Sequence, residues 1–118
     1  MPSNEDLCDV FQPHPEVITT LRESIPDLNR LTELFKALGD PTRAHIIYLI
    51  SRNELCVCDI AELLDSSVSN ISHHLRVLRN CRLVRYRREG RQAFYRLADE
   101  HVLHLFNAGM RHLEYPEP

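Results

Sequence analysis

Two cysteines one residue apart, Cys56 and Cys58, are the residues of this sequence best suited to do chemistry. They lie in the stretch ELCVCDIAELL, just before apolar spacing that predicts a short helix at about 59–64. The positive end of a helix dipole favours the thiolate form of a nearby cysteine, and thiolate is the form that binds metal. Thiolates prefer soft ions such as cadmium, lead or arsenite to magnesium or calcium. The alternative is a pair of small buried cysteines that only pack.

Two thiols alone make an incomplete metal site, and the sequence offers a third near its N-terminus. Cys8 lies in residues 1–15, which contain three prolines and no apolar period and therefore predict a mobile arm. The acidic start of the chain lacks the pattern of a secretory signal, and no stretch is apolar enough to span a bilayer. We therefore expect a cytoplasmic protein with no membrane partner, whose cysteines are free thiols or metal ligands. Cys81 has no obvious thiol partner and is expected to pack.

Arginines are concentrated in one part of the chain, although the net charge is −3. Residues 66–97 hold eight arginines and one acidic residue, Glu89, whereas the rest of the chain holds six basic and sixteen acidic residues. This segregation predicts a positive surface on an acidic body, which is the electrostatic pattern of a DNA-binding face. The alternative is a solvated basic face without a ligand.

Helical spacing of apolar residues brackets this basic region on both sides. It runs over 16–38, with an interruption at Pro26, and again over 99–114 at the end of the chain. Asp40 and Pro41 have the residue types of an N-cap and a first helical position, so they predict the start of a further helix.

Within the basic region the pattern predicts a helix-turn-helix followed by a hairpin. The short helix at 59–64 is followed by a turn and a second helix over 67–80, whose capping residue is serine. Residues 83–97 change to strand-like alternation, and Gly90 can take the positive φ of a tight hairpin loop. The predicted fold is mainly α with a small β-hairpin (α+β), a winged helix-turn-helix domain over 16–115.

Two groups of side chains are expected to contact double-stranded operator DNA. Polar residues near the start of the second helix can reach base edges in the major groove: Ser69, Asn70, Ser72, His73 and Arg76. Three arginines predicted at the hairpin tip would contact phosphates or enter the minor groove: Arg87, Arg88 and Arg91. A single winged helix makes few contacts, so a homodimer on two half-sites is expected.

Several motifs together resemble the ArsR/SmtB family of bacterial metal-sensing repressors. They are ALGDPTR, ELCVCDIAELL, SVSNISHHLRVLR and VRYRREGRQAFYRLAD, and the resemblance covers about residues 31–112. The most similar members are the CadC-type cadmium, lead and zinc sensors. The resemblance implies a transcriptional repressor that holds its operator as a metal-free homodimer and releases it when metal binds.

The resemblance also implies which residues hold the effector ion, cadmium, lead or zinc. Cys56 and Cys58 would bind it together with Cys8, which in related sensors comes from the other subunit. The CadC-like pattern has a second arm cysteine where this chain has Gln12. His14, or alternatively Asp9, is the expected replacement, and a nitrogen ligand would shift the preference towards zinc.

A second metal site, for zinc, is implied on the last helix. Zinc sensors of the family use an Asp-x-His at the start of this helix and a His-x-x-Glu near its end, paired across the dimer. Asp99, His101 and His112 match, whereas Glu114 stands one residue early. The alternative is that Asp99 is an ordinary N-cap and His112 a surface residue near a helix C-terminus.

The same cysteines would also suit two other sensing functions. An arsenite sensor would share ELCVCD, but Ala61 stands where a third cysteine is usual, so that site would also need Cys8. A thiol redox switch on the same fold would release DNA when Cys56 or Cys58 is oxidised. The sequence has no glycine-rich phosphate loop, zinc-protease helix or nucleophile elbow. We therefore expect neither an enzyme nor a small-molecule substrate.

Overall fold

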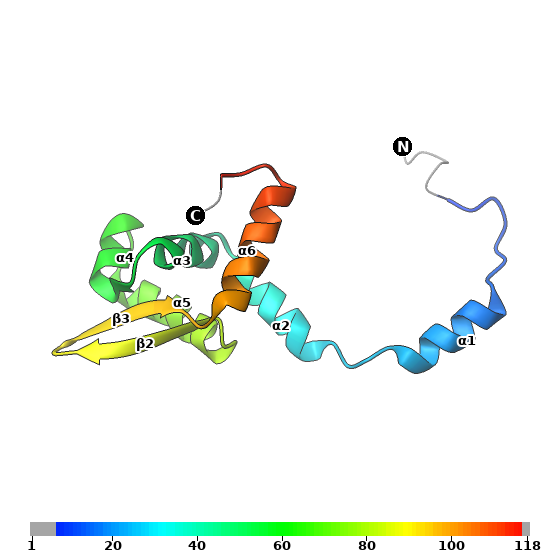
Figure 1. The fold of residues 1–118 in the computed structure, drawn as a ribbon, viewed down its shortest axis with the longest axis horizontal. Coiled ribbons are helices and arrows are strands. Elements are labelled where there is room, and N and C mark those ends of the chain that lie inside the picture. The colour runs from blue at the N-terminus through cyan, green and yellow to red at the C-terminus, as the bar shows by residue number, and fades with distance from the viewer. Residues whose placement is uncertain (1–6, 117–118) are drawn as a thin grey trace.

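The computed structural model describes residues 7–116, which form a winged-helix body and one N-terminal helix that stands apart from it (Figure 1). In chain order the elements are α1 (Pro15–Ser24), α2 (Asn29–Leu38), α3 (Pro41–Arg52), β1 (Leu55–Cys56), α4 (Val57–Leu63), α5 (Val68–Asn80), β2 (Val84–Glu89), β3 (Gln92–Leu97) and α6 (Glu100–His112). The predicted mainly α fold with a β-hairpin is confirmed, and so is the interruption of the first helical segment around Pro26.

Side-chain caps set the starts of α3 and α5 as the sequence predicts. Asp40 precedes α3, and its carboxylate accepts a hydrogen bond from the backbone N–H of Arg43 at 3.0 Å, with Pro41 as the first helical residue. Ser67 caps α5 in the same way, because its hydroxyl accepts from the N–H of Asn70 at 3.0 Å. Local hydrogen bonds therefore fix the start of α3 and the start of α5, the second helix of the helix-turn-helix.

The turn between α4 and α5 depends on a left-handed residue. Asp65 has φ 51°, a conformation that costs most side chains energy but that Asp tolerates better than most. The N–H of Ser66 then donates to the carbonyl of Ala61 at 3.0 Å, and the hydroxyl of Ser66 accepts from the side-chain amide of Asn70 at 2.9 Å. Ser66 thus bridges α4 to α5 through hydrogen bonds.

The sheet has three antiparallel strands in the order β1-β3-β2. The strands β2 and β3 form the wing, with Glu89 opposite Gln92 and Gly90 at φ 61° in the two-residue loop. The two-residue strand β1 was not predicted, and it pairs Leu55 with Tyr95 and Cys56 with Phe94. The segment leading into α4 is therefore part of the same sheet as the wing.

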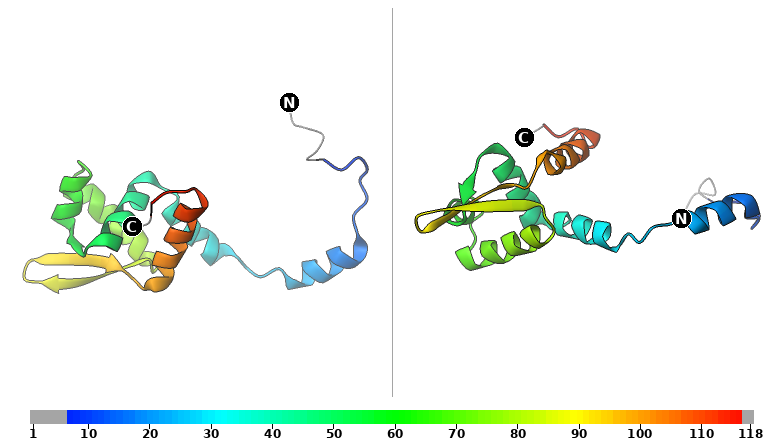
Figure 2. Two further views of the ribbon diagram at one scale, coloured as in Figure 1. Left: turned by 45° about the horizontal axis from the view of Figure 1, so that its top comes forward. Right: turned by 60° about the horizontal axis from the view of Figure 1, so that its bottom comes forward.

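The core lies between α3, α4, α5 and the sheet. Its fully buried side chains include the three that the sequence predicts on the inner face of α5, Ile71, Leu75 and Leu78. The helix α1 contributes no buried residue, and Figure 1 and both views of Figure 2 show it standing clear of the body. The described part of the chain is accordingly elongated, with principal extents of 64 × 33 × 24 Å. Within residues 7–116, no helix is both long and apolar enough to cross a bilayer.

Candidate metal centre and nucleic-acid interface

Cys56 and Cys58 lie where β1 passes into α4. Cys56 is the last residue of β1 and the N-cap of α4, and it is 4% exposed, whereas Cys58 is exposed in the first turn. A capping box holds Cys56: its backbone N–H donates to the carboxylate of Asp59 at 3.1 Å, and its sulfur accepts from the N–H of Asp59. The prediction that both thiols lie at a helix start is confirmed, although the helix begins two residues earlier than expected.

The electrostatic state of Cys56 differs from the expectation. The sequence argument expects the helix dipole to favour thiolate, but burial raises the pKa of the Cys56 thiol, and the nearby Asp59 carboxylate adds to this effect. The N–H of Asp59 acts in the opposite direction and does not outweigh burial. The net effect is a pKa for Cys56 above that of a free thiol, opposite to the direction in which the helix end acts.

Two residues that the sequence analysis missed connect this segment to the wing. The side-chain amide of Gln92, the first residue of β3, donates to the sulfur of Cys56 at 3.6 Å. Glu54, two residues before Cys56, forms an ion pair with Arg87 of β2 at 2.6 Å. Both contacts follow from the pairing of β1 with β3. A strand of two residues shows no periodicity in the sequence, so this pairing could not be predicted.

The predicted arm ligands lie far from these thiols within one chain. Cys8 and His14 are exposed and precede α1, which stands at the opposite end of the molecule from α4 (Figure 1). Across residues 7–116, no three His, Cys, Asp or Glu side chains are gathered closely enough to hold a metal ion. The two halves of the predicted site, Cys56 with Cys58 and Cys8 with His14, are therefore not brought together inside the described chain.

The residues of the predicted second site are divided between the two ends of α6. Asp99 is the N-cap of α6: its Oδ1 accepts from the backbone N–H of His101 at 2.9 Å and lies 3.4 Å from Nδ1 of the same residue. His112 ends the helix, and Glu114 lies beyond it with φ 63°. The two ends are about 18 Å apart at 1.5 Å per residue, so one chain alone cannot bring these ligands together.

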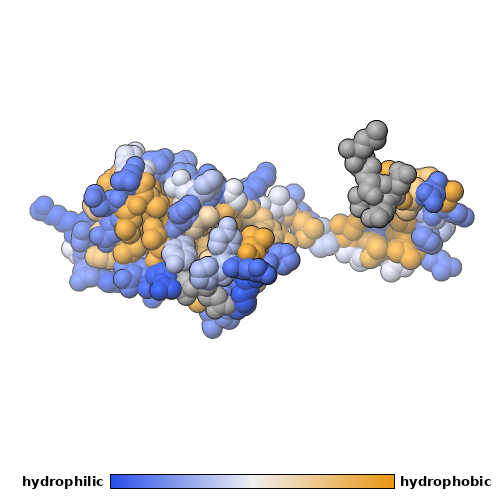
Figure 3. All heavy atoms as spheres, turned by 90° about the horizontal axis from the view of Figure 1, so that it is seen from above, coloured by the Kyte–Doolittle hydropathy of each residue, from blue (hydrophilic) through white to orange (hydrophobic). Residues whose placement is uncertain are grey.

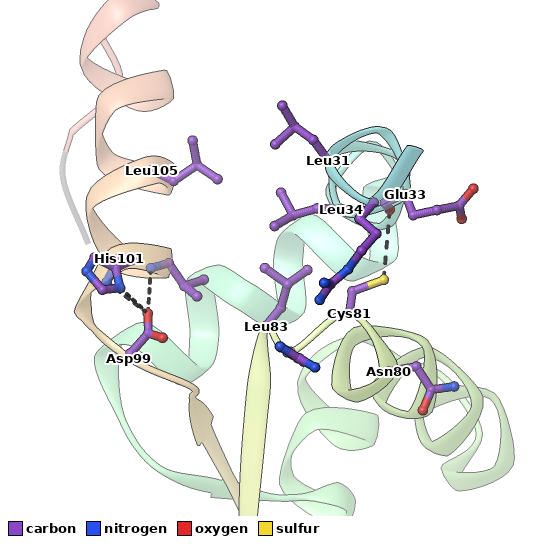
Figure 4. Close-up of a pocket in the computed structure, with 12 residues that line it drawn as sticks. Leu31, Glu33, Leu34, Asn80, Cys81, Leu83, Asp99, His101 and Leu105 are labelled. Atoms are coloured by element: carbon purple, nitrogen blue, oxygen red, sulfur yellow. Dashed lines mark hydrogen bonds and ion pairs between the residues drawn. The ribbon is translucent and has the colours of Figure 1, made fainter. Parts of the chain in front are cut away.

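A hollow of 490 Å³ lies between α2, the end of α5 and the start of α6. Figure 4 shows Leu31 and Leu105 pointing into it from facing helices, with Asp99 and Cys81 on opposite sides. Cys81 is half-buried against the core, and its thiol lies 3.8 Å from the carbonyl of Glu33. Its contacts are those of a packing residue, as the sequence analysis expects.

The predicted base-reading residues lie along α5. Ser69, Asn70, His73 and Arg76 are exposed, while Ser72 is half-buried. The amide nitrogen of Asn70 donates one hydrogen bond to Ser66, which leaves its second N–H and its carbonyl oxygen for contact with a base. Contact of these residues with DNA stays a prediction.

His74 connects α5 to the start of α3, a role that the sequence does not predict. Its Nδ1 lies 3.1 Å from Nη1 of Arg43 and 3.9 Å from the carboxylate of Asp40. A guanidinium can only donate, so Nδ1 accepts, and the imidazole is neutral with its proton on Nε2. Burial lowers the pKa of His74, and Arg43 and His73 add to this lowering while Asp40 opposes it. We therefore take the contact with Asp40 as one to a neutral ring.

The wing corrects the predicted position of one arginine. Arg91 lies in the loop and Arg88 is opposite Ala93 beside it, but Arg87 is in mid-strand opposite Phe94 rather than at the tip. The guanidinium of Arg87 lies 2.6 Å from Glu54 and 2.7 Å from Glu89, and these carboxylates raise its pKa. Arg88 and Arg91 are exposed, so the wing offers two prominent cations near its loop.

Large apolar side chains are exposed on several helices, and α1, α2 and α6 carry many of them. Figure 3 shows hydrophobic residues gathered over the separate helix α1 and on part of the body. The exposed residues on these helices include Val17, Leu21, Leu31, Phe35 and Leu105, each at least 38% exposed. A second hollow, of 980 Å³, lies between α2, α3 and α6. Extensive exposed apolar surface of this kind marks an interaction site.

Comparison with known proteins identifies the family that shares this fold. Residues 40–86 match the family described as bacterial regulatory protein, arsR family. The chain is 41% identical over 111 residues to the "Transcriptional repressor SmtB homolog" of Synechocystis sp., which spans 92% of this chain and 84% of that protein. It is 39% identical over 111 residues to the "Cadmium resistance transcriptional regulatory protein CadC homolog" of Staphylococcus aureus, and this alignment covers 92% of each chain.

A solved structure gives the same picture at the level of the fold. The homodimeric winged helix-turn-helix DNA-binding domain of a Mycobacterium bovis protein superposes with a TM-score of 0.71 and 27% identity, covering 88% of this chain and 91% of that chain. The curated relatives are transcriptional regulators rather than enzymes. Their identity over most of both chains shows that this chain belongs to the ArsR/SmtB family of bacterial winged-helix transcriptional repressors.

Proposed function

We propose that this protein is a metal-responsive repressor that binds operator DNA as a metal-free homodimer and releases it when cadmium, lead or zinc binds at Cys8, Cys56 and Cys58. The observation that carries the proposal is the position of the two thiols of the Cys-x-Cys pair. Cys56 ends β1, which belongs to the same sheet as the wing, and Cys58 lies in the first turn of α4, which packs against α5. The similarity to a cadmium-resistance regulator over most of the chain supports the same choice of effector.

The donor set fits a soft cation. Cys58 is exposed and open to an incoming ion, and Cys56 presents a sulfur that already accepts two N–H hydrogen bonds. Burial disfavours the thiolate form of Cys56. A bound cation reverses this effect, because a thiol that coordinates a metal is deprotonated outright. Three thiolates with or without the imidazole of His14 would satisfy cadmium or lead, and inclusion of His14 would favour zinc.

The arm that completes the site is expected to come from the second subunit. The helix α1, which follows Cys8 in the chain, lies at the far end of the molecule from α4, so closure within one chain would require the arm to fold back along the molecule (Figure 1). A homodimer would also cover the exposed apolar side chains of α1, α2 and α6. In such a dimer, Cys8 of the partner subunit would join Cys56 and Cys58.

Release of DNA would follow from the contacts of α4 and β1. The helix α4 packs on α5 through the core, and β1 pairs with β3, so a metal that fixes this junction to the arm acts on both DNA-contacting elements. A coupling free energy of about 3 kcal/mol changes operator affinity by roughly two orders of magnitude. This coupling needs only different metal affinities of the free and DNA-bound dimers.

Fluorescence anisotropy tests the function directly. A labelled duplex is first selected from a random-sequence library with the reduced, metal-free protein. Binding is then measured with saturating cadmium, lead or zinc, and with magnesium as the control for nonspecific screening. The proposal expects the soft metals to weaken binding and magnesium to leave it unchanged. Arsenite and peroxide arms examine the two alternatives, an arsenite sensor and a thiol redox switch.

We also propose a zinc site across the dimer on α6. Asp99 and His101 of one subunit would meet His112 and Glu114 of the other if the two α6 helices pack antiparallel, since the two pairs occupy opposite ends of one helix. The N-cap role of Asp99 uses one carboxylate oxygen and leaves the other for a metal. Zinc that remains bound in a variant with Cys8, Cys56 and Cys58 all changed to serine, and is lost on His112→Ala, would support this site.

A further inference from the structure

We propose that Gln92 is a positioning residue for the metal-binding thiolate of Cys56 and ties the metal centre to the wing. The inference rests on the proposed function and adds a residue to the proposed metal site. Its basis is the hydrogen bond from the side-chain amide of Gln92 to the sulfur of Cys56 at 3.6 Å, which joins residues 36 positions apart in the sequence.

The hydrogen bond has the chemistry of an outer-shell contact to a metal ligand. A neutral thiol is a weak acceptor, whereas a thiolate attracts N–H donors strongly. Two such donors converge on this sulfur, the backbone N–H of Asp59 and the side chain of Gln92. Donors of this kind orient a metal ligand and tune its binding, and their loss typically lowers metal affinity about 10–100-fold.

The same contact places the metal centre next to a DNA-contacting segment. Gln92 begins β3, directly after the wing loop, and lies opposite Glu89 in the strand register. Its backbone follows Arg91, the exposed arginine of the wing loop. A change in the charge or position of the Cys56 sulfur therefore alters its hydrogen bond to Gln92, the first residue of β3.

Two substitutions separate the hydrogen bond from packing. Gln92→Leu keeps a similar volume and removes the donor, whereas Gln92→Lys changes the shape and retains a donor. We expect Gln92→Leu to weaken cadmium binding about 10-fold or more and Gln92→Lys to stay close to wild type. A packing role predicts the reverse order. Arg96→Leu, on the same strand and the same face, controls for the loss of a polar side chain.

The decisive readout is spectroscopic and uses the full-length protein loaded with ¹¹³Cd. A scalar coupling between ¹¹³Cd and the side-chain amide proton of Gln92, carried through the N–H···S hydrogen bond, is expected in wild type and absent in Gln92→Leu. Cadmium that binds wild type and Gln92→Leu equally, with no such coupling, would overturn the role of Gln92 and leave metal-regulated repression standing. Wild-type protein that binds no cadmium would overturn both proposals.

Discussion

Nη2 of Arg87 lies 2.6 Å from Oε1 of Glu54, so the segment leading into the two cysteines is held to the wing by an ion pair. The same guanidinium also contacts Glu89 at 2.7 Å. An arginine engaged by two carboxylates has little net charge to offer a phosphate, and this distinguishes Arg87 from Arg88 and Arg91.

The first prediction concerns these wing arginines. Arg88→Gln and Arg91→Gln should each weaken DNA binding and reduce the slope of log affinity against log salt by about 1, as expected for one phosphate contact. Arg87→Gln should change the slope distinctly less, because its charge is already compensated. Anisotropy titrations over a range of salt concentrations measure all three. Equal slopes for the three variants would show that the carboxylates do not withhold Arg87 from DNA.

The second prediction tests whether the arm closes between subunits. Cys8→Ser and Cys56→Ser homodimers should each lose tight cadmium binding. Mixing them should restore one intact site per heterodimer, because the unmutated Cys8 of one subunit reaches the intact Cys56 and Cys58 of the other. Thiolate-to-cadmium absorbance of the mixture, compared with each parent, measures the recovery. Closure within one chain would leave the heterodimer without a site and the mixture without signal.

The third prediction follows from the neutral imidazole of His74. In the unfolded chain this histidine takes a proton near its ordinary pKa of 6.5, whereas in the folded protein its pKa lies lower. The unfolded state therefore binds more protons just below pH 6.5, so this contribution to stability is complete above pH 6.5 and is lost as the pH falls. Urea unfolding of His74→Gln should show a weaker loss of stability on acidification than wild type.

His73→Gln provides the matched control for that measurement. His73 neighbours His74 in sequence, with the ring centroids 5.5 Å apart, but it is exposed. Its removal should leave most of the pH dependence in place. If His74→Gln and wild type lose stability in parallel between pH 7 and pH 5.5, the assignment of a neutral, half-buried imidazole is wrong.

The fourth prediction concerns the turn of the helix-turn-helix. Asp65→Val should lower the free energy of unfolding by about 1–2 kcal/mol, because a β-branched residue is strained at φ 51°. Asp65→Gly should match or exceed wild-type stability at the same position, since glycine adopts positive φ without that strain. Urea denaturation at neutral pH compares them. A Val variant as stable as the Gly variant would mean that the turn relaxes to another conformation.

Local patterns predict much of this fold from the sequence. Asp40 and Ser67 cap helices where their types and positions predict, and Gly90 takes positive φ in the hairpin loop. These features depend on hydrogen bonds within a few residues, so the sequence carries them directly. The family resemblance, drawn from motifs over most of the chain, is confirmed by the curated relatives.

Contacts between distant segments could not be predicted in the same way. The strand β1 is two residues long, so the sequence does not reveal that Cys56 pairs with the wing or that Gln92 reaches its sulfur. The sequence predicts the effect of the helix end on the Cys56 thiol but not its burial, a tertiary property that raises the pKa of this thiol. Arg87 is likewise paired with a carboxylate 33 residues away in the chain.

The most direct test of the account is one anaerobic cadmium titration of the reduced protein bound to its selected, labelled duplex. Thiolate-to-cadmium absorbance and duplex anisotropy are read in the same sample. We predict that absorbance saturates at one ion per subunit while anisotropy falls in parallel, and that Cys8→Ser weakens both signals. Operator affinity that stays unchanged under saturating cadmium, lead and zinc would contradict metal-triggered release of DNA.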